Sequence, residues 1–140
     1  SGGIYFGNNI DEQIKILNSN EDQLKQNLST LRFRAKSHIY KFLREGLQRY
    51  PSNQIRISEP DPNENWRPPE NAINNFSLKR IENDDFPFPI EIDIPFWTLD
   101  ADIDFKRWIL GFRDGIKVES PEVFLDEIKK TYKDLNKLYN

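Results

Sequence analysis

The stretch FKRWILGFRDGIKVESPE, residues 105–122, decides the fold because helix, turn, strand and helix signals follow one another within it. Its first half carries apolar residues at helical spacing: Phe105, Trp108, Ile109 and Phe112. Asp100 or Asp102 is suited to cap this helix, since a carboxylate accepts hydrogen bonds from free backbone N–H groups. The GIKVES segment then alternates as a half-buried strand does. Ser120 is suited to cap a closing helix, with Pro121 at its first helical position.

Similar patterns extend towards the N-terminus. LRFRA (31–35), QIRIS (54–58) and PIEIDIP (89–95) alternate apolar and polar residues, which predicts three more strands. Between the first two, apolar residues recur at helical spacing from Ile39 to Tyr50, with Ser37 as the expected cap and Pro51 as the stop. The order strand, helix, strand, strand, helix, strand predicts an α+β, ferredoxin-like βαββαβ sandwich with an additional C-terminal helix.

Two segments fall outside this pattern. Residues 59–89 hold six of the nine prolines and almost no periodicity, which predicts a long Pro-rich insertion between strands 2 and 3. Residues 1–29 begin with Ser-Gly-Gly and are mostly polar, and the chain has no Met. We therefore interpret 1–29 as a cloning remnant and a lead-in from an upstream domain, and 30–140 as one domain.

Composition excludes several classes of protein. The chain has no Cys, so it has no disulfide, no thiolate nucleophile and no Cys-based metal site. We also expect no other metal site and no cofactor. No apolar run approaches the roughly 20 residues of a membrane span, so we expect a cytoplasmic protein. The net charge of −3 argues against a cationic surface over the whole domain.

The basic residues are concentrated in one part of the chain. Residues 30–60 hold seven Lys or Arg against two Glu, although charged blocks of this kind are more often solvated faces than binding sites. On the predicted sheet, Arg32, Arg34 and Arg56 point away from the helices, on the same face as Glu91 and Asp93. Two interpretations remain open: inert cross-strand ion pairs, or a surface on which the three arginines bind phosphates of a nucleotide or nucleic-acid effector.

The WILGFRDGIKVESPE motif resembles the C-terminal extension of WYL-domain transcriptional regulators. The residues that carry the resemblance include Trp108, Gly111, Phe112, Asp114, Gly115 and Pro121. YPSNQ (50–54) resembles the turn that closes the first helix of that extension, and the Asn- and Ile-rich composition is similar to that of CRISPR-associated members. The Trp97-Thr98-Leu99 triplet departs from the family's Trp-Tyr-Leu signature, and no helix-turn-helix pattern is present.

The resemblance implies a non-catalytic effector-sensing and assembly domain. The parent regulator would bind DNA as a homodimer through an upstream DNA-binding domain, and an upstream WYL domain would adjoin this one. A purely structural dimerisation domain is the main alternative. A CRISPR-related RNA-binding protein is a weaker alternative, because charged residues occupy the positions where stacking aromatics would stand. A CRISPR-related RNA-processing enzyme is also weaker, because such enzymes resemble one another in a glycine-rich basic loop near the C-terminus, whereas this chain ends in KKTYKDLNKLYN.

Physical chemistry gives the motif a structural interpretation as well. Trp108 and Phe112 would anchor the helix on the sheet, and Gly111 and Gly115 would allow a tight turn, with a positive φ at Gly115. Asp114 would bond backbone amides in that turn.

We expect no enzyme. Asp100, Asp102 and Asp104 imitate the start of a calcium-binding loop, but Phe105 and Gly111 stand where that loop needs Gly and Glu. His38, the only histidine, has no suitably spaced nucleophile.

Overall fold

The computed structural model describes residues 28–140, without the side chains of Arg49, Phe96 and Trp97. The predicted lead-in therefore lies almost entirely outside the described residues. Its last two residues, Leu28 and Ser29, belong to the first strand, which begins earlier than the LRFRA pattern predicts.

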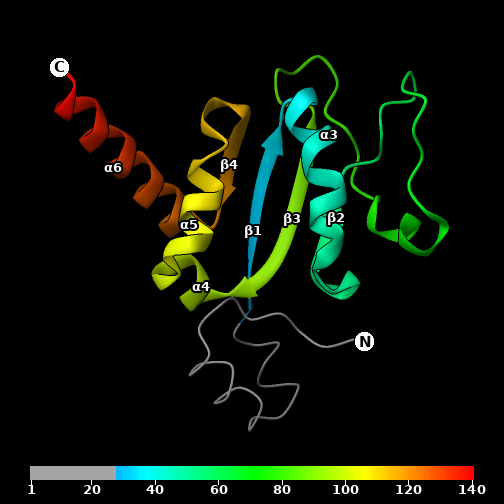
Figure 1. Cartoon of the computed structure of the whole chain (residues 1–140), viewed down its shortest axis with the longest axis horizontal. Coiled ribbons are helices and arrows are strands. Elements are labelled where there is room, and N and C mark those ends of the chain that lie inside the picture. Colours follow the sequence, from blue (N-terminus) through cyan, green and yellow to red (C-terminus); the bar gives the residue numbers. More distant parts are fainter. Residues whose placement is uncertain (1–27) are drawn as a thin grey trace, which may run out of the picture.

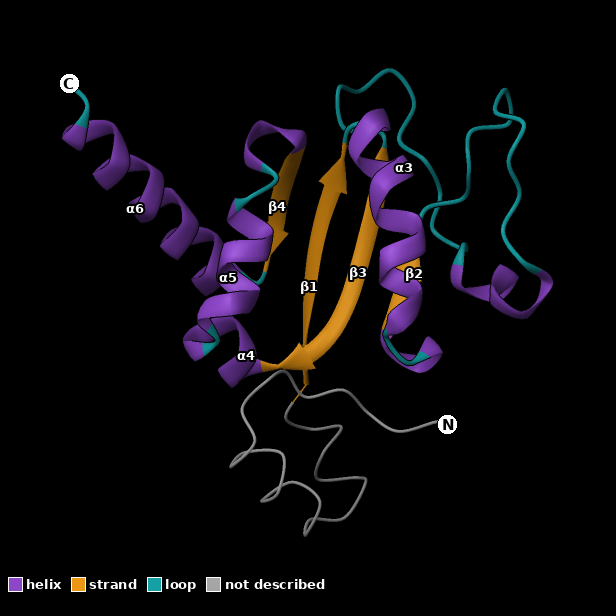
Figure 2. Ribbon diagram, in the orientation of Figure 1, coloured by secondary structure: helices purple, strands orange, loops and turns teal. Residues whose placement is uncertain are grey.

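The fold is α+β, with a four-stranded antiparallel sheet and several helices (Figures 1 and 2). The main elements in chain order are β1 (Leu28–Ala35), α3 (Ser37–Gly46), β2 (Ile55–Ile57), β3 (Phe88–Pro95), α4 (Phe96–Ala101), α5 (Ile103–Leu110), β4 (Ile116–Ser120) and α6 (Glu122–Leu138). The strand order across the sheet is β2-β3-β1-β4, so both crossing segments connect strands that are not neighbours.

Helices α3 and α5 lie on one face of the sheet, in front of it as drawn in Figure 2. The strand residues that face them are buried, and Leu31, Phe33, Ile90 and Ile92 have no exposed surface. Tyr40 of α3 stacks on Phe88 of β3 with ring centroids 4.2 Å apart. The core therefore lies between the helices and the sheet.

The helix starts differ in detail from the sequence predictions. Asp102 caps α5 as expected, accepting a hydrogen bond from the backbone N–H of Phe105 at 3.1 Å. At the start of α3, however, Lys36 takes the cap position, and Ser37 is the first helical residue. The short helix α4 between β3 and α5 was not predicted, because its six residues are too few to show a period.

The connection between β2 and β3 is long, and one 3-10 helix, Glu70–Asn75, lies within it. The connection packs back onto the domain, since Phe76 is buried and Trp66 contacts the core. It also extends the sheet at the edge of β2, where Ser58 and Leu78 form a parallel bridge. There the backbone N–H of Leu78 donates to the Ile57 carbonyl at 3.1 Å.

Candidate functional site

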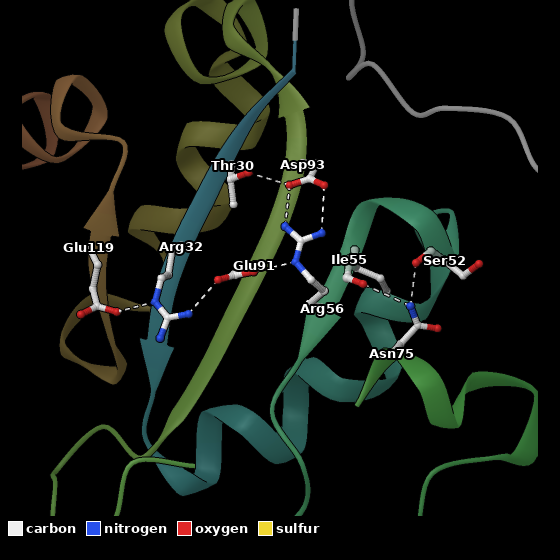
Figure 3. Close-up of polar contacts among 9 residues, drawn as sticks. All are labelled: Thr30, Arg32, Ser52, Ile55, Arg56, Asn75, Glu91, Asp93 and Glu119. Carbon is white, nitrogen blue, oxygen red and sulfur yellow. Dashed lines mark hydrogen bonds and ion pairs between the residues drawn. The ribbon is translucent and has the colours of Figure 1, made fainter. Parts of the chain in front are cut away.

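The charged face of the sheet is the candidate site, and the strand register creates it. In the β1–β3 pairing Arg32 lies opposite Glu91, and in the β2–β3 pairing Arg56 lies opposite the same glutamate. Because side chains alternate along a strand, these residues share the face opposite the core. Figure 3 shows Arg32, Glu91 and Arg56 in a row across three strands, with Glu119 of β4 at one end.

Arg56 makes the densest set of contacts. Its two terminal nitrogens bind both carboxylate oxygens of Asp93, at 2.7 and 2.9 Å, and its Nε donates to Glu91 at 2.6 Å (Figure 3). Thr30 donates to the same Asp93 carboxylate at 2.7 Å. Two parallel N–H···O bonds to one carboxylate are the strongest geometry open to a guanidinium, so Arg56 is held firmly.

The other two arginines are also paired. Arg32 bridges strands by donating to Glu91 at 2.8 Å and to Glu119 at 3.0 Å. Arg34 lies 3.3 Å from Asp84 and 3.4 Å from Glu119, and its side chain is almost buried. Asp84 belongs to the β2–β3 connection, so that connection covers one end of the charged face.

The pKa values of the two β3 carboxyls reflect this pairing. Partial burial alone would raise the pKa of Glu91, but hydrogen bonds from Arg56 and Arg32 outweigh it and hold the pKa below its usual value. Burial likewise opposes ionisation of Asp93, and the bonds from Arg56 and Thr30 lower its pKa. The hydrogen bond with Asp93 in turn raises the pKa of Arg56, so all three groups stay charged at neutral pH.

The structure thus brings the three candidate arginines onto one face, and four carboxylates balance them: Asp84, Glu91, Asp93 and Glu119. A phosphate that approached this face would have to displace carboxylates and would meet their negative charge. The arrangement matches cross-strand ion pairing, worth about 0.2–1 kcal/mol per pair, more closely than a prepared anion site.

The motif residues of the opening stretch form a structural turn. Trp108 lies between two aromatic rings, 5.7 Å from Phe105 and 5.2 Å from Phe112 by ring centroid. Trp108 and Phe112 are only partly buried, however, and the residues of α5 that enter the core are Phe105 and Ile109. Phe105 and Ile109 therefore attach α5 to the core, and Trp108 and Phe112 pack around them.

The two glycines serve close packing. A Cβ on Gly115 would lie 2.5 Å from Cγ1 of Ile39, so this residue lets β4 approach α3. A Cβ on Gly111 would lie 3.1 Å from the Arg107 carbonyl. The predicted positive φ at Gly115 is wrong: the left-handed residue of the turn is Arg113, with a φ of 53°.

Asp114 and Pro121 also differ from expectation. The Asp114 carboxylate is exposed and lies 3.8 Å from Lys36 Nζ, rather than on amides of its own turn. Pro121 follows a cis peptide bond and occupies the cap position of α6, one residue before the helix.

A second polar cluster was missed by sequence reasoning. Arg44 of α3 is buried, with its guanidinium 3.8 Å from the Trp66 ring centroid, and it binds both carboxylate oxygens of Glu64 at 2.8 Å. These bonds lower the pKa of Glu64. The cluster holds the β2–β3 connection against α3. Arg44 lies about 20 residues from Glu64 and Trp66 in the sequence, so no local pattern predicts their contact.

The remaining chemistry-bearing residues do not converge. His38 lies exposed at the start of α3. Within residues 28–140 no group of three His, Asp or Glu side chains is placed to hold a metal ion. Among the described helices none combines the length and apolarity that crossing a membrane requires.

Comparison of the chain with protein-family models, with curated proteins and with solved structures gave no match.

Proposed function

We propose that the chain is a non-catalytic assembly domain with a ferredoxin-like fold, belonging to a WYL-type, CRISPR-associated transcriptional regulator. Upstream WYL and DNA-binding domains of the same chain would be its partners in a homodimer. The resemblance of WILGFRDGIKVESPE to the family's extension carries the family part of this proposal.

Two features support the fold part of the proposal. Strand order β2-β3-β1-β4 with all neighbours antiparallel is the order expected when two strand-helix-strand units interlock. The proposed Pro-rich insertion, about 59–89, corresponds to the β2–β3 connection, which holds Trp66 and Phe76 against the domain.

The observation that favours assembly over effector binding is the closed charge balance of the sheet face. Each arginine on it is paired with carboxylates at 2.6–3.4 Å. The ion pairs on this face link neighbouring strands, and the arginines leave no net positive charge to attract an anion.

Effector sensing through Arg32, Arg34 and Arg56 is the second candidate. It is favoured by the exposure of two of these side chains, 31% for Arg32 and 34% for Arg56, which leaves part of each guanidinium within reach of solvent. A nucleotide or nucleic-acid effector would have to exchange with Glu91 and Asp93.

Fluorescence anisotropy with short labelled single-stranded DNA and RNA tests the choice. The titration is done at two salt concentrations, on the wild-type chain and on a variant with Arg32→Gln and Arg56→Gln. A second variant, Lys129→Gln and Lys130→Gln, removes two positive charges from α6 and serves as the matched control.

If the chain is only an assembly domain, we expect no salt-sensitive binding of the labelled DNA or RNA at micromolar protein concentration. Binding that weakens with salt, is lost in the arginine variant and survives in the lysine variant would show that the sheet face senses an anionic effector, and would overturn the assembly-only interpretation.

A further inference from the structure

A groove lies between α5, β4 and α6. In Figure 1, α6 leaves the sheet beside α5, and its C-terminal end points outwards. The groove has a volume of about 340 Å³, near the lower end of the roughly 300–1,000 Å³ that is typical of small-molecule sites. At roughly 30 Å³ for each water-sized group, it has room for roughly eleven non-hydrogen atoms.

The floor of the groove is apolar and buried. Ile109 of α5 and Ile116 and Val118 of β4 line it, and no more than 9% of each residue is exposed. Leu125 and Ile128 of α6 also line the groove, and both pack against the core while they remain partly exposed. A polar group placed on this floor would lose its hydrogen bonds with water, so the part of a ligand that lies there has to be apolar.

Three cations line the same groove: Arg113, Lys117 and Lys129. They come from the turn after α5, from β4 and from α6, and all three are exposed. No carboxylate among the described residues lines the groove. The groove is therefore complementary to a ligand that has an apolar body and an anionic end.

The three cations are not neutralised within residues 28–140, where none of them is in an ion pair. The acidic residues within two positions of them in the sequence are paired with other cations. Asp114 lies 3.8 Å from Lys36 Nζ, Glu127 lies 2.6 Å from Lys106 Nζ, and Glu119 belongs to the charged face of the sheet. The groove thus differs from that face, where carboxylates balance each arginine.

Arg113 has a backbone conformation that is unfavourable for arginine. Its φ of 53° lies in the left-handed region, which glycine adopts readily and most other residues avoid. It stands two residues beyond Gly111, the cap of α5, and a left-handed residue at the end of a helix is usually glycine. Strained residues of this kind cluster at ligand sites. An arginine in place of glycine is therefore an independent indication that this side chain has a role in the groove.

We propose that the groove binds a free amphipathic carboxylate of the medium-chain fatty acid class. The apolar chain lies on the buried floor, and Arg113, Lys117 and Lys129 donate hydrogen bonds to the carboxylate. Room for roughly eleven atoms fits a chain of about eight to ten carbons, whereas an acidic peptide or an anionic membrane surface would present many more atoms than the groove holds. The site is separate from Arg32, Arg34 and Arg56, and the inference does not depend on the family or the assembly role proposed above.

Titration of the isotopically labelled 140-residue chain with sodium decanoate, followed by two-dimensional NMR, tests the proposal. The amide signals of Ile116, Val118, Leu125 and Ile128 should shift and give a Kd of about 0.05–1 mM, since small ligands in open sites bind with modest affinity. Hexanoate, which has a shorter chain, should bind about tenfold more weakly, because less apolar surface is buried. Decyltrimethylammonium, which has a decyl chain and a positive charge, should bind about fivefold more weakly or less.

A variant with Arg113→Gly and Lys117→Gln separates binding from stability. Glycine fits a φ of 53° better than arginine does, so the urea midpoint should not fall. The Kd for decanoate should rise about fivefold or more, because two ion pairs with the ligand are lost. Arg107→Gln with Lys133→Gln is the matched control: it removes the same charge from α5 and α6, outside the groove lining, and should change the Kd by less than about twofold, since distant exposed charges are screened.

Several results would overturn the proposal. The groove would have no such ligand if its amide signals do not shift at millimolar decanoate, or if decyltrimethylammonium binds as tightly as decanoate. An unchanged Kd in the Arg113 and Lys117 variant would show that these cations do not hold the carboxylate. Shifts confined to Arg32 and Arg56 would place the anion on the charged face of the sheet, which would overturn the groove site and favour the second candidate function instead.

Discussion

Replacement of Gly115 by alanine tests whether close packing, rather than backbone freedom, explains the glycine at this turn. The added Cβ would lie 2.5 Å from Cγ1 and 2.9 Å from Cδ1 of Ile39, whereas carbon atoms in good contact are about 3.5–4.0 Å apart. The φ of Gly115 lies outside the left-handed region, so alanine adds no backbone strain. Ile39 is β-branched and on a helix, and its χ1 has little freedom to move away. We expect a loss of about 1–3 kcal/mol in the free energy of unfolding, typical of overpacking.

Urea unfolding, followed by circular dichroism and by tryptophan fluorescence, measures this loss. Gly46→Ala is the control, because a Cβ at this position would have no atom within 4 Å. Since Gly46 is the last residue of α3 and alanine is the better helix former, this substitution should raise the free energy of unfolding by about 0.5–1 kcal/mol. Ile39→Ala removes both clashing atoms, so Gly115→Ala should cost less in that background than in the wild type. If Gly115→Ala is neutral, or if the two substitutions are additive, the packing argument fails.

Two further predictions concern buried polar contacts. Tyr40→Phe removes the hydroxyl that donates to the Ser58 carbonyl at 2.8 Å, and should lower the free energy of unfolding by about 1–3 kcal/mol, because it leaves a buried acceptor unpaired; an unchanged urea midpoint would contradict this. The pKa values of Glu91 and Asp93 are lower in the folded than in the unfolded chain, so their ionised forms stabilise the fold. This contribution is fully present above about pH 4.3, the unfolded pKa of Glu, and is lost as the pH falls through the pKa values of the folded state. A variant with Glu91→Gln and Asp93→Asn should therefore show a flatter fall of the urea midpoint between about pH 5 and pH 2, and an unchanged slope would show that these carboxyls do not cause the acid sensitivity.

Local sequence patterns predicted much of the fold. Alternation identified all four strands because one face of each is buried. The cap of α5 was narrowed to Asp100 or Asp102, because either carboxylate precedes the amphipathic run, and only the structure selects Asp102. The early start of β1 was missed, because Leu28 and Ser29 pair with the end of β3 and show no alternation of their own.

The candidate site was predicted only in part. Alternation placed Arg32, Arg34 and Arg56 on one face, but not their partners, since register depends on contacts between distant strands. Asp84 could not be assigned to Arg34, because an irregular connection carries no period from which a position can be inferred. For the same reason the pairing of each of these arginines with carboxylates was visible only in the folded chain.

The bridge between Ser58 and Leu78 bears on how the protein stays dispersed in a crowded cell. An uncovered strand at the edge of a sheet is a template on which other chains can add strands and aggregate. Here the Leu78 carbonyl accepts a hydrogen bond from the backbone N–H of Glu59 at 2.8 Å, and the Leu78 N–H donates to the Ile57 carbonyl. Leu78 therefore occupies backbone groups that a foreign strand would use. The β2–β3 connection thus covers the edge of the three-residue strand β2. A protease cut within the connection would expose this edge to pairing with other chains, even if the core remained folded.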